Sequence, residues 1–521
     1  MLNMFQTFLL INRRSMDEVI IGRAGRTMTK QELKCEIELA MKCLAILGLK
    51  SGDVLMLHMP LLIEGVVLTF AANALGIKVA YANFEGTDQE FIAERQKYRA
   101  KIVAKYQEAR VGRPSGVHFY RIVADMSFWA SSYDALLTLA ASANIKLRSQ
   151  KLQNLVSRRE LIYLQTSGST AVRPKGLPFT NSNIFHTLLF AAKSTGTTTH
   201  SEEVDKALCI LNFRHPYGWM PLFINLMGGN RVELAVGATA KDIGEWHKTR
   251  PSYIYGTPQF LREFIRETPK DADLSFLRAF FCAGDKTEEE LFVQFREFCA
   301  EHGATQAEIR NNYGVGELLC VGTTSDGIPH RVGTSGKFYQ GPTWVIVDED
   351  LNPVPTGTVG EIIVHSKTMI RHYFQNEEET KKVFVKFNGK RFFRTGDYAS
   401  VDADGYVTIV GRKKRFYIPR GSTDKVNCET IEQALLSITE LVADCAVIIY
   451  TLEDGSKSSC AFVVTKPDVP ESDATRDRIF AWLRRLLRPF QLPTRIEFLS
   501  ELPYMPSGKV NYIKLEQTIQ P

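Results

Sequence analysis

A run of small hydroxylated residues follows an apolar segment near the end of the first third of the chain. Residues 161–165 have the apolar weight of a buried strand. The run that follows is Thr166, Ser167, Gly168, Ser169 and Thr170. Such a loop can turn several N–H groups and hydroxyls toward one point, and Lys175 adds a positive charge. The loop suits a polyphosphate, although it is no G-x-x-x-x-G-K-[ST] loop; an ordinary surface turn is the alternative.

A second candidate segment is N-N-Y-G-V-G-E, residues 311–317, which follows a strand-like run. Tyr313 stands beside Gly314 and can present its ring face to a flat base. Glu317 supplies a carboxylate, and Mg²⁺ prefers oxygen ligands and keeps phosphates in its coordination shell. The alternative is a turn with an exposed glutamate.

Three further short segments could complete a nucleotide site. Thr395-Gly396-Asp397 offers a carboxylate that can accept hydrogen bonds from both hydroxyls of a ribose, or else a type I turn. Gly411-Arg412 follows, and P-Y-M-P-S-G-K at residues 503–509 places Lys509 on a glycine-led loop. A lysine on such a loop can be delivered into a site by a mobile domain.

These segments, in this order, resemble the signatures of the adenylate-forming superfamily of acyl- and aryl-CoA ligases, luciferases and adenylation domains. The family patterns are T-S-G-[ST]-T-G-x-P-K-G, Y-G-x-[TS]-E, T-G-D, G-R and P-x-x-x-x-G-K, and the resemblance spans most of the chain. It implies ATP and Mg²⁺ as cofactors, a small-molecule carboxylic acid activated to acyl-AMP, and acyl transfer to a thiol. CoA is the leading acceptor.

The resemblance also implies roles for single residues. Lys509 would be catalytic, Glu317 would bind the metal, and Lys414 would be the hinge. Adenine would stack on Tyr313, and Asp397 would bind the ribose. The nucleotide-binding candidates are Thr166, Ser167, Gly168, Ser169, Thr170, Lys175, Gly284, Asn312, Tyr313, Gly314, Asp397 and Arg412.

The segment F-R-H-P-Y-G, residues 213–218, resembles the family's H-x-[FY]-G beside the acyl pocket. It makes His215 a second catalytic candidate, with a strand-end histidine as the alternative. The amino-acid-activating branch has an aspartate here, and Arg214-His215 argues against an α-amino acid substrate. The candidate pocket walls, which could equally be core aromatics, are Tyr217, Trp219, Tyr255 and Phe281.

Several positions depart from the family patterns. Gly316 replaces a hydroxyl residue, Ile418 replaces a lysine, and A-V-R at residues 171–173 stands where the family has glycine and one further residue. Thr430 stands at the family's final glutamate, unless Glu429 shifts into register. Two other functions therefore stay open: an acyl-AMP ligase serving a separate carrier protein or an amine, and a catalytically weak nucleotide-binding protein. The sequence does not name the acid.

The elements that must position these residues alternate between strand and helix. Thr29 to Leu47 has helical spacing, with a capping box from Thr29 to Glu32. Strand-like runs at 54–58, 78–82, 207–211, 231–235, 252–255 and 278–282 with helices between them predict doubly wound parallel sheets. Residues 84–157 are less regular, and 333–410 suit a β-rich subdomain.

The predicted fold class is α/β, with a small mobile α+β C-terminal domain. A dense basic run after Gly411 marks the boundary, giving an N-terminal ATP- and acyl-binding domain at 1–412 and a C-terminal lid carrying Lys509 at 413–521.

Composition limits the other classes of function. The chain has 521 residues, 44% hydrophobic and 23% charged, and its net charge of +6 argues against nucleic-acid binding. Nine cysteines without a C-x-x-C pair favour a reducing cytoplasm over a disulfide framework. The most apolar long stretch, residues 54–82, is interrupted by polar residues and proline, so no membrane span is expected.

Overall fold

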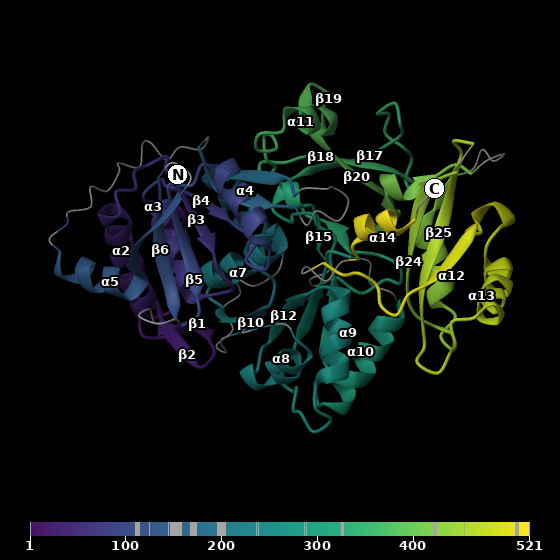
Figure 1. Cartoon of the computed structure of the whole chain (residues 1–521), viewed down its shortest axis with the longest axis horizontal. Coiled ribbons are helices and arrows are strands. Elements are labelled where there is room, and N and C mark those ends of the chain that lie inside the picture. The colour runs from purple at the N-terminus through teal and green to yellow at the C-terminus, as the bar shows by residue number, and fades with distance from the viewer. Residues whose placement is uncertain are drawn as a thin grey trace. The chain divides into compact units, whose positions relative to one another are not determined.

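The computed structural model divides the chain into two compact units (Figure 1). The first contains the chain up to Thr166, Lys175–Thr343 and His365–Lys386; the second contains Trp344–Val364 and the chain from Phe387 onward. The structure describes residues 2–109, 115–123, 126–143, 145, 159–166, 174–194, 205–235, 237, 239–285, 287, 289–324, 328–419, 425–452, 454–505 and 510–519.

The first unit holds two seven-stranded sheets. One runs in the order β7-β6-β5-β3-β4-β8-β9 and contains β3 (Val54–His58), β4 (Lys78–Tyr81), β5 (Ile102–Gln107), β6 (Gly116–Val123), β7 (Met126–Ser132), β8 (Glu160–Gln165) and β9 (Gly176–Thr180). Strands β5, β3, β4 and β8 are parallel, and β6, β7 and β9 pair antiparallel at the two edges.

The other sheet runs in the order β14-β13-β12-β10-β11-β1-β2. It contains β1 (Val19–Arg23), β2 (Arg26–Thr29), β10 (Lys206–Cys209), β11 (Arg231–Leu234), β12 (Tyr253–Gly256), β13 (Ala279–Cys282) and β14 (Glu308–Asn311). All of its pairs are parallel except β1 with β2. The predicted doubly wound parallel sheets are confirmed, because uninterrupted apolar runs are typical of strands buried on both faces.

The helices of the first unit follow the predicted alternation. They are α1 (Met4–Ile11), α2 (Lys30–Ile46), α3 (Ile63–Ala74), α4 (Asp88–Tyr98), α5 (Tyr133–Ser142), α6 (Asn181–Ser194), α7 (Pro216–Gly228), α8 (Ala240–Glu245), α9 (Pro258–Glu267), α10 (Glu289–Glu301) and α11 (Glu377–Val383). The capping box predicted at Thr29 is present: its side chain accepts from the Glu32 N–H, and Glu32 accepts from the Thr29 N–H.

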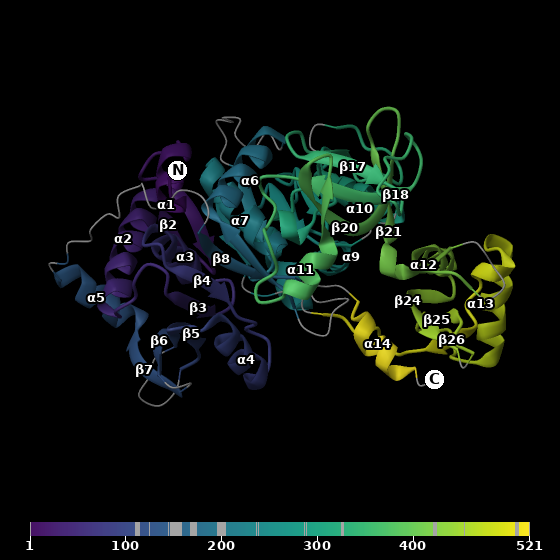
Figure 2. The same cartoon turned by 90° about the horizontal axis from the view of Figure 1, so that it is seen from above.

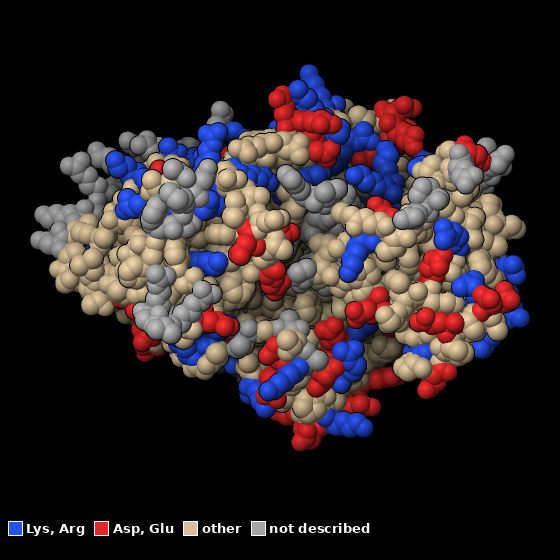
Figure 3. Space-filling model, viewed as in Figure 1, with Lys and Arg blue, Asp and Glu red and all other residues tan. Residues whose placement is uncertain are grey.

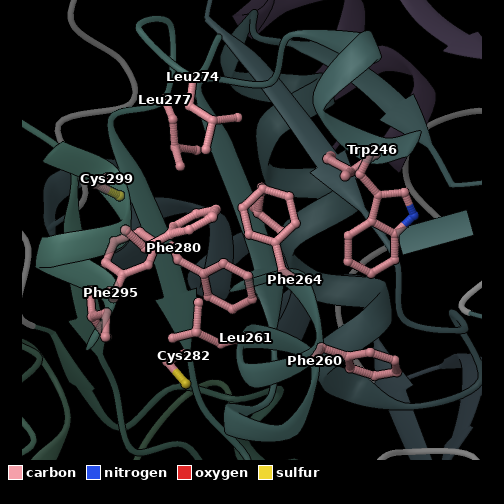
Figure 4. Close-up of a cluster of buried hydrophobic side chains, with 14 of the residues drawn as sticks. Trp246, Phe260, Leu261, Phe264, Leu274, Leu277, Phe280, Cys282, Phe295 and Cys299 are labelled. Carbon is pink, nitrogen blue, oxygen red and sulfur yellow. The ribbon is translucent and has the colours of Figure 1, made fainter. Parts of the chain in front are cut away.

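Aromatic side chains form much of the core. The Phe70 ring of α3 lies 5.5 Å from Phe8 of α1 and 5.4 Å from Phe223 of α7, so these three helices pack together. A separate cluster under the second sheet is centred on Phe264 and Phe280, both fully buried (Figure 4). These cores make the sheets rigid supports for the loops at their edges.

A β-rich part is present in the range predicted, although its longest strand, β20, has 12 residues. Its five-stranded sheet runs β17-β18-β20-β19, with β21 paired to β20. The strands are β17 (Thr343–Val347), β18 (Gly360–His365), β19 (Phe384–Phe387), β20 (Lys390–Val401) and β21 (Val407–Arg412). Two small antiparallel pairs are β15 (Thr323–Thr324) with β16 (Lys337–Phe338), and β22 (Phe416–Tyr417) with β23 (Val426–Asn427).

The C-terminal part is a three-stranded sheet with helices on both faces (Figure 2). Its elements are α12 (Cys428–Leu436), β24 (Val442–Thr451), β25 (Lys457–Thr465), α13 (Asp473–Leu486), β26 (Arg495–Phe498) and α14 (Tyr512–Thr518). Side chains of α12 and α13 pack with Val447 on one face, and Leu515 of α14 packs with Ile448 on the other. The boundary predicted after Arg412 falls inside the second unit and stays a prediction.

Four short 3₁₀ segments complete the described elements: Trp246–Thr249, Gly316–Leu318, Lys413–Arg415 and Pro489–Gln491. None of the helices in the described part of the chain is long and apolar enough to span a membrane.

Candidate functional site

The base of the hydroxylated loop is a closed hairpin. Strands β8 and β9 are antiparallel, with Gln165 opposite Gly176. Beyond them, the Lys175 N–H donates to Thr166 Oγ1 at 3.0 Å, and the Thr166 N–H donates to the Lys175 carbonyl at 3.0 Å. The two ends of the loop are therefore fixed to each other. The predicted phosphate ligands Ser167, Gly168, Ser169 and Thr170 lie outside the described residues.

The Lys175 side chain is held by two neighbours. Its Nζ lies 2.7 Å from Glu379 Oε2 and 4.7 Å from the centre of the Tyr373 ring. The hydrogen bonds from Lys175 and Lys382 lower the pKa of the Glu379 carboxyl to about 2, so this carboxylate is charged at neutral pH. The positive charge of Lys175 thus has a defined position at the loop base.

Glu317 lies on a tight turn. The backbone on the two sides of this turn pairs in an antiparallel bridge between Gly314 and Gly322. The two strands of the turn approach so closely that a Cβ on Gly322 would lie 2.2 Å from the Tyr313 carbonyl oxygen. Leu319 and Cys320 both have positive φ, 54° and 60°, an uncommon backbone conformation for such residues. Conformational strain of this kind persists where the surrounding structure imposes it, and here it fixes the turn that presents the carboxylate.

Glu317 also has a side-chain partner that the sequence analysis missed. The Tyr373 hydroxyl donates to Glu317 Oε1 at 2.6 Å, and the Ile370 N–H donates to the Glu317 carbonyl at 2.9 Å. None of the motifs quoted above includes Tyr373.

The donor set at Glu317 fits a magnesium ion carried by a nucleotide. The described residues contain no group of three or more His, Cys, Asp or Glu that could enclose a metal. Mg²⁺ is usually held by one or two carboxylates together with substrate phosphates, so a single glutamate suffices when ATP supplies the other ligands.

Other predicted nucleotide residues lie just past the carboxyl ends of neighbouring parallel strands. Gly284 follows β13 and has φ +93°; Asn312 and Tyr313 follow β14. The Asn312 N–H donates to the Cys282 carbonyl at 2.9 Å, which extends the pairing of the two strands. Ligands bind at this edge in open α/β sheets, so the placement agrees with a nucleotide-binding role for these residues.

His215 lies next to the loop base. It is the residue preceding α7, and its Nδ1 is 3.2 Å from the Gln165 carbonyl oxygen. Its Nε2 is 3.2 Å from Arg214 Nη2, and the Gln165 N–H donates to the Arg214 carbonyl at 3.0 Å. His215 thus contacts the residue that precedes Thr166, and its catalytic role stays a prediction.

Three of the four predicted pocket aromatics form one contact group. The Tyr217 hydroxyl donates to the carbonyls of Phe281 at 2.9 Å and Gly256 at 3.2 Å. Tyr255 stacks on Phe281 with 4.5 Å between ring centres. Trp219 instead donates from Nε1 to Tyr81 and is 1% exposed. Trp219, Tyr255 and Phe281 are buried and Tyr217 is partly buried, so their part in an acyl pocket stays a prediction beside the core alternative.

Asp397 and Arg412 form an ion pair in the second unit. They lie opposite each other on β20 and β21, with 2.8 Å between Asp397 Oδ1 and Arg412 Nε. The Asp397 N–H donates to Thr395 Oγ1, which in turn donates to the Ile362 carbonyl, both at 3.0 Å. Gly396 has φ +72°, a conformation that glycine adopts readily. The T-G-D motif is thus a kinked strand segment that presents one carboxylate.

The basic residues on either side of the predicted hinge form ion pairs with two different glutamates. Lys413 Nζ lies 3.5 Å from Glu361 of β18. Arg415 is buried, 2.6 Å from Glu432 Oε1, and donates to the Val447 carbonyl at 2.7 Å. Lys414 between them is exposed, which suits a pivot. Lys509 lies outside the described residues.

The structure clarifies one departure from the family pattern. A Cβ on Gly411 would lie 2.7 Å from a carboxylate oxygen of Glu429, so Glu429 packs directly against the G-R motif. Thr430 is the next residue on α12. The carboxylate next to Gly411-Arg412 is therefore that of Glu429. This agrees with an alignment in which Glu429, and not Thr430, matches the final glutamate of the family pattern.

Comparison with known proteins agrees with this fold. Residues 11–374 match the model of the AMP-binding enzyme family, and residues 430–509 match the AMP-binding enzyme C-terminal domain. The chain belongs to this family, the adenylate-forming superfamily, and is an AMP-forming ligase of the acyl-CoA synthetase type.

Its relatives are distant in sequence. It is 24% identical over 504 residues to a probable CoA ligase, CCL5, of Humulus lupulus, covering 94% of this chain and 88% of the relative. It is 29% identical over 367 residues to benzoate–CoA ligase of Thauera aromatica, covering 68% and 65%. Among solved structures, the anthranilate CoA ligase AuaEII in complex with anthranoyl-AMP aligns with a TM-score of 0.81 at 22% identity, covering 99% and 97%.

Proposed function

We propose that the chain activates an aryl or aliphatic carboxylic acid with MgATP and transfers the resulting acyl group to a thiol, with CoA as the leading acceptor. The observation that supports this most is the joint contact of Lys175 and Glu317 with Tyr373. One phosphate-binding charge and one metal-binding carboxylate thus lie close together at the edge where nucleotides bind.

In the first half-reaction, a carboxylate oxygen of the acid attacks the α-phosphorus of ATP. The bond from that phosphorus to pyrophosphate breaks, giving acyl-AMP. Because both reactants are anions, the approach is electrostatically opposed, and fixed positive charges at the phosphates lower the barrier. Lys175 and Lys509 would supply such charges. Glu317 would hold Mg²⁺, which when bound adds further charge stabilisation on the phosphates.

In the second half-reaction, a thiol attacks the acyl-AMP carbonyl, and AMP leaves. Lys509 and the segment after Arg412 would enter the site in turn, so the C-terminal domain at 413–521 would rotate about Lys414 between steps. Lys413 and Arg415, the residues on either side of Lys414, are each held by an ion pair with a glutamate. The change in backbone dihedral angles during the rotation would therefore occur at Lys414.

CoA is favoured as the acceptor by two observations. The two sequence relatives named above bear the names of CoA ligases. Basic side chains also gather over β17 and β20 on the face shown in Figure 3, and phosphates of CoA would be attracted to such a surface. A separate carrier protein or an amine is the rival acceptor, and it is motivated by Ile418, which is 49% exposed where the family has a lysine.

The experiment is pyrophosphate release from MgATP with a panel of aryl and aliphatic acids, followed by mass spectrometry of thioesters after addition of CoA. We expect release with at least one acid and formation of its CoA thioester. Pyrophosphate release without any CoA thioester would favour the rival function, in which the acyl group passes to a carrier protein or an amine. No release with any acid, while ATP still binds, would indicate a nucleotide-binding protein without ligase activity.

A further inference from the structure

Residues 367–380 form a strap that is hydrogen-bonded to the backbone of Glu317 and of Gly176, the residue after Lys175. The Ile370 N–H donates to the Glu317 carbonyl, and the Phe374 N–H donates to the Gly176 carbonyl, each at 2.9 Å. The strap is far from both partners in sequence. It therefore joins the turn that carries Glu317 to the base of the loop that carries Lys175.

Tyr373 projects from the strap between Glu317 and Lys175. Its side chain is buried, with 2% of the residue exposed. The hydroxyl donates to Glu317 Oε1 at 2.6 Å, and Lys175 Nζ lies 4.7 Å from the ring centre. One rigid side chain thus makes a charge-assisted hydrogen bond to the carboxylate and a cation–π contact with the ammonium.

The strap holds Tyr373 in place through its own contacts. The Tyr373 N–H donates to Thr380 Oγ1 at 3.0 Å. The next residue, Phe374, stacks on Tyr98 with 5.1 Å between ring centres and meets Tyr163 edge-on at 4.9 Å. Because Phe374 is anchored in the aromatic cluster beneath the first sheet, Tyr373 cannot move without disturbing that cluster.

Glutamate and lysine side chains have many rotamers, and holding each in one position costs conformational entropy. A buried tyrosine that contacts both reduces the number of arrangements that they sample before the nucleotide binds. The effect concerns the relative placement of Lys175 and Glu317 and does not require Tyr373 to touch the substrate.

We propose that Tyr373 is a positioning residue for MgATP: it holds the Glu317 carboxylate and the Lys175 ammonium in the relative arrangement that receives the metal-bound phosphates. The proposal rests on the proposed function, because that function assigns Glu317 to the metal and Lys175 to the phosphates. It adds a residue that lies outside the motifs quoted above.

The test is calorimetric ATP binding at a series of Mg²⁺ concentrations, with the Tyr373→Phe variant. Phenylalanine keeps the ring beneath Lys175 and removes only the hydroxyl that bonds Glu317. A hydrogen bond to a charged group is lost, so the Mg²⁺ concentration that half-saturates the metal-dependent gain in ATP affinity should rise about tenfold or more. Metal-free ATP affinity should change less than about twofold, because the cation–π contact remains.

The matched control is Tyr133→Phe. Tyr133 is also buried and also donates to a glutamate, Glu36 Oε1, at 3.0 Å, but it lies on α5 packed against α2. It should lose a comparable hydrogen bond and leave the Mg²⁺ dependence of ATP binding unchanged. A shift of the same size in both variants would attribute the effect to general destabilisation and overturn the proposal.

Glu317→Gln separates this inference from the proposed function. If Glu317→Gln shifts the Mg²⁺ dependence and Tyr373→Phe does not, the positioning proposal is wrong while the metal assignment stands. If Glu317→Gln has no effect, the metal assignment itself is wrong and the proposal falls with it. Where both shift, the double variant should be no worse than Glu317→Gln alone, since the tyrosine acts through that carboxylate.

Discussion

Arg412 Nε lies 2.8 Å from Asp397 Oδ1, and these two residues face each other across paired strands. The aspartate side chain is 5% exposed, whereas the arginine side chain is 54% exposed and covers it. A carboxylate has about four acceptor sites on its two oxygens, so Asp397 can keep this ion pair and still accept hydrogen bonds from ribose hydroxyls.

The first prediction concerns Asp397→Ala. If the carboxylate binds the ribose, its removal should weaken ATP binding by about 1.5–3 kcal/mol, because hydrogen bonds to a charged acceptor are lost. Calorimetric titration with ATP measures this directly. Unchanged nucleotide affinity would remove Asp397 from the ribose site.

The second prediction concerns the ion pair of Arg415, which is buried, and Glu432, which is partly buried. Arg415→Met should destabilise the protein by about 3 kcal/mol, because it leaves the partly buried Glu432 carboxylate without its charged partner. Urea denaturation measures the loss. The exposed pair of Lys381 and Glu377 provides the control: Lys381→Met should cost less than about 1 kcal/mol. Similar losses in both variants would contradict the anchoring role of Arg415.

The third prediction is a pH dependence from His58. Burial, together with nearby Lys105, lowers the pKa of this histidine to about 4. The histidine is protonated near pH 6.5 in the unfolded chain but only near pH 4 in the folded chain. Above pH 6.5 it is neutral in both states, so the folded state carries no protonation penalty and its full stability is present. The contribution of His58 is lost as the pH falls from 6.5 to about 4, and the total is about 3 kcal/mol.

His58→Leu should remove this component. Melting temperatures of the wild type and the variant, measured at pH 7.5 and pH 5, should therefore diverge, with the wild type losing more stability on acidification. Parallel losses in the two proteins would show that His58 does not contribute to acid sensitivity.

The fourth prediction concerns Gly316, where the family has a hydroxyl residue. A Cβ here would meet only Leu177 and Pro216 side-chain atoms at 3.5 Å, an ordinary contact distance. Gly316→Ser should therefore fold normally and tighten MgATP binding by about two- to tenfold through one added neutral hydrogen bond. Gly316→Ala controls for the backbone effect. Equal affinities of the Ser and Ala variants would show that the hydroxyl has no ligand in this site.

The parallel strands and the nucleotide segments could be predicted because each has a local signal. Residues 54–57 and 79–82 are continuous apolar runs, and the loop at 166–170 has an unusual concentration of small hydroxylated residues. Residues 84–157 were harder, because β7 is an edge strand, β6 lies between it and β5, and both strands mix polar and apolar residues. Such strands carry weaker patterns than buried parallel strands.

The role of Tyr373 could not be predicted. Its bond to Glu317 joins residues 56 positions apart, and the Lys175–Glu379 pair joins residues 204 positions apart. Contacts between residues so far apart in sequence depend on where the fold places residues 367–380. A local pattern of residue types does not predict that placement. The same applies to the division of Lys413 and Arg415 between separate glutamates.

The central claim is that acyl-AMP forms first and is then consumed by a thiol, with Lys509 serving only the first step. The measurement is a pair of rates on Lys509→Ala: pyrophosphate release from acid plus ATP, and thioester formation from synthetic acyl-AMP plus CoA. Loss of one well-placed charge should lower the first rate by about 10²–10³, and Lys509→Arg should rescue it poorly because its geometry differs. The second rate should stay near that of the wild type. Equal losses in both rates would show that Lys509 supports the fold or the whole site, and would contradict the account in which one domain conformation delivers Lys509 and another withdraws it.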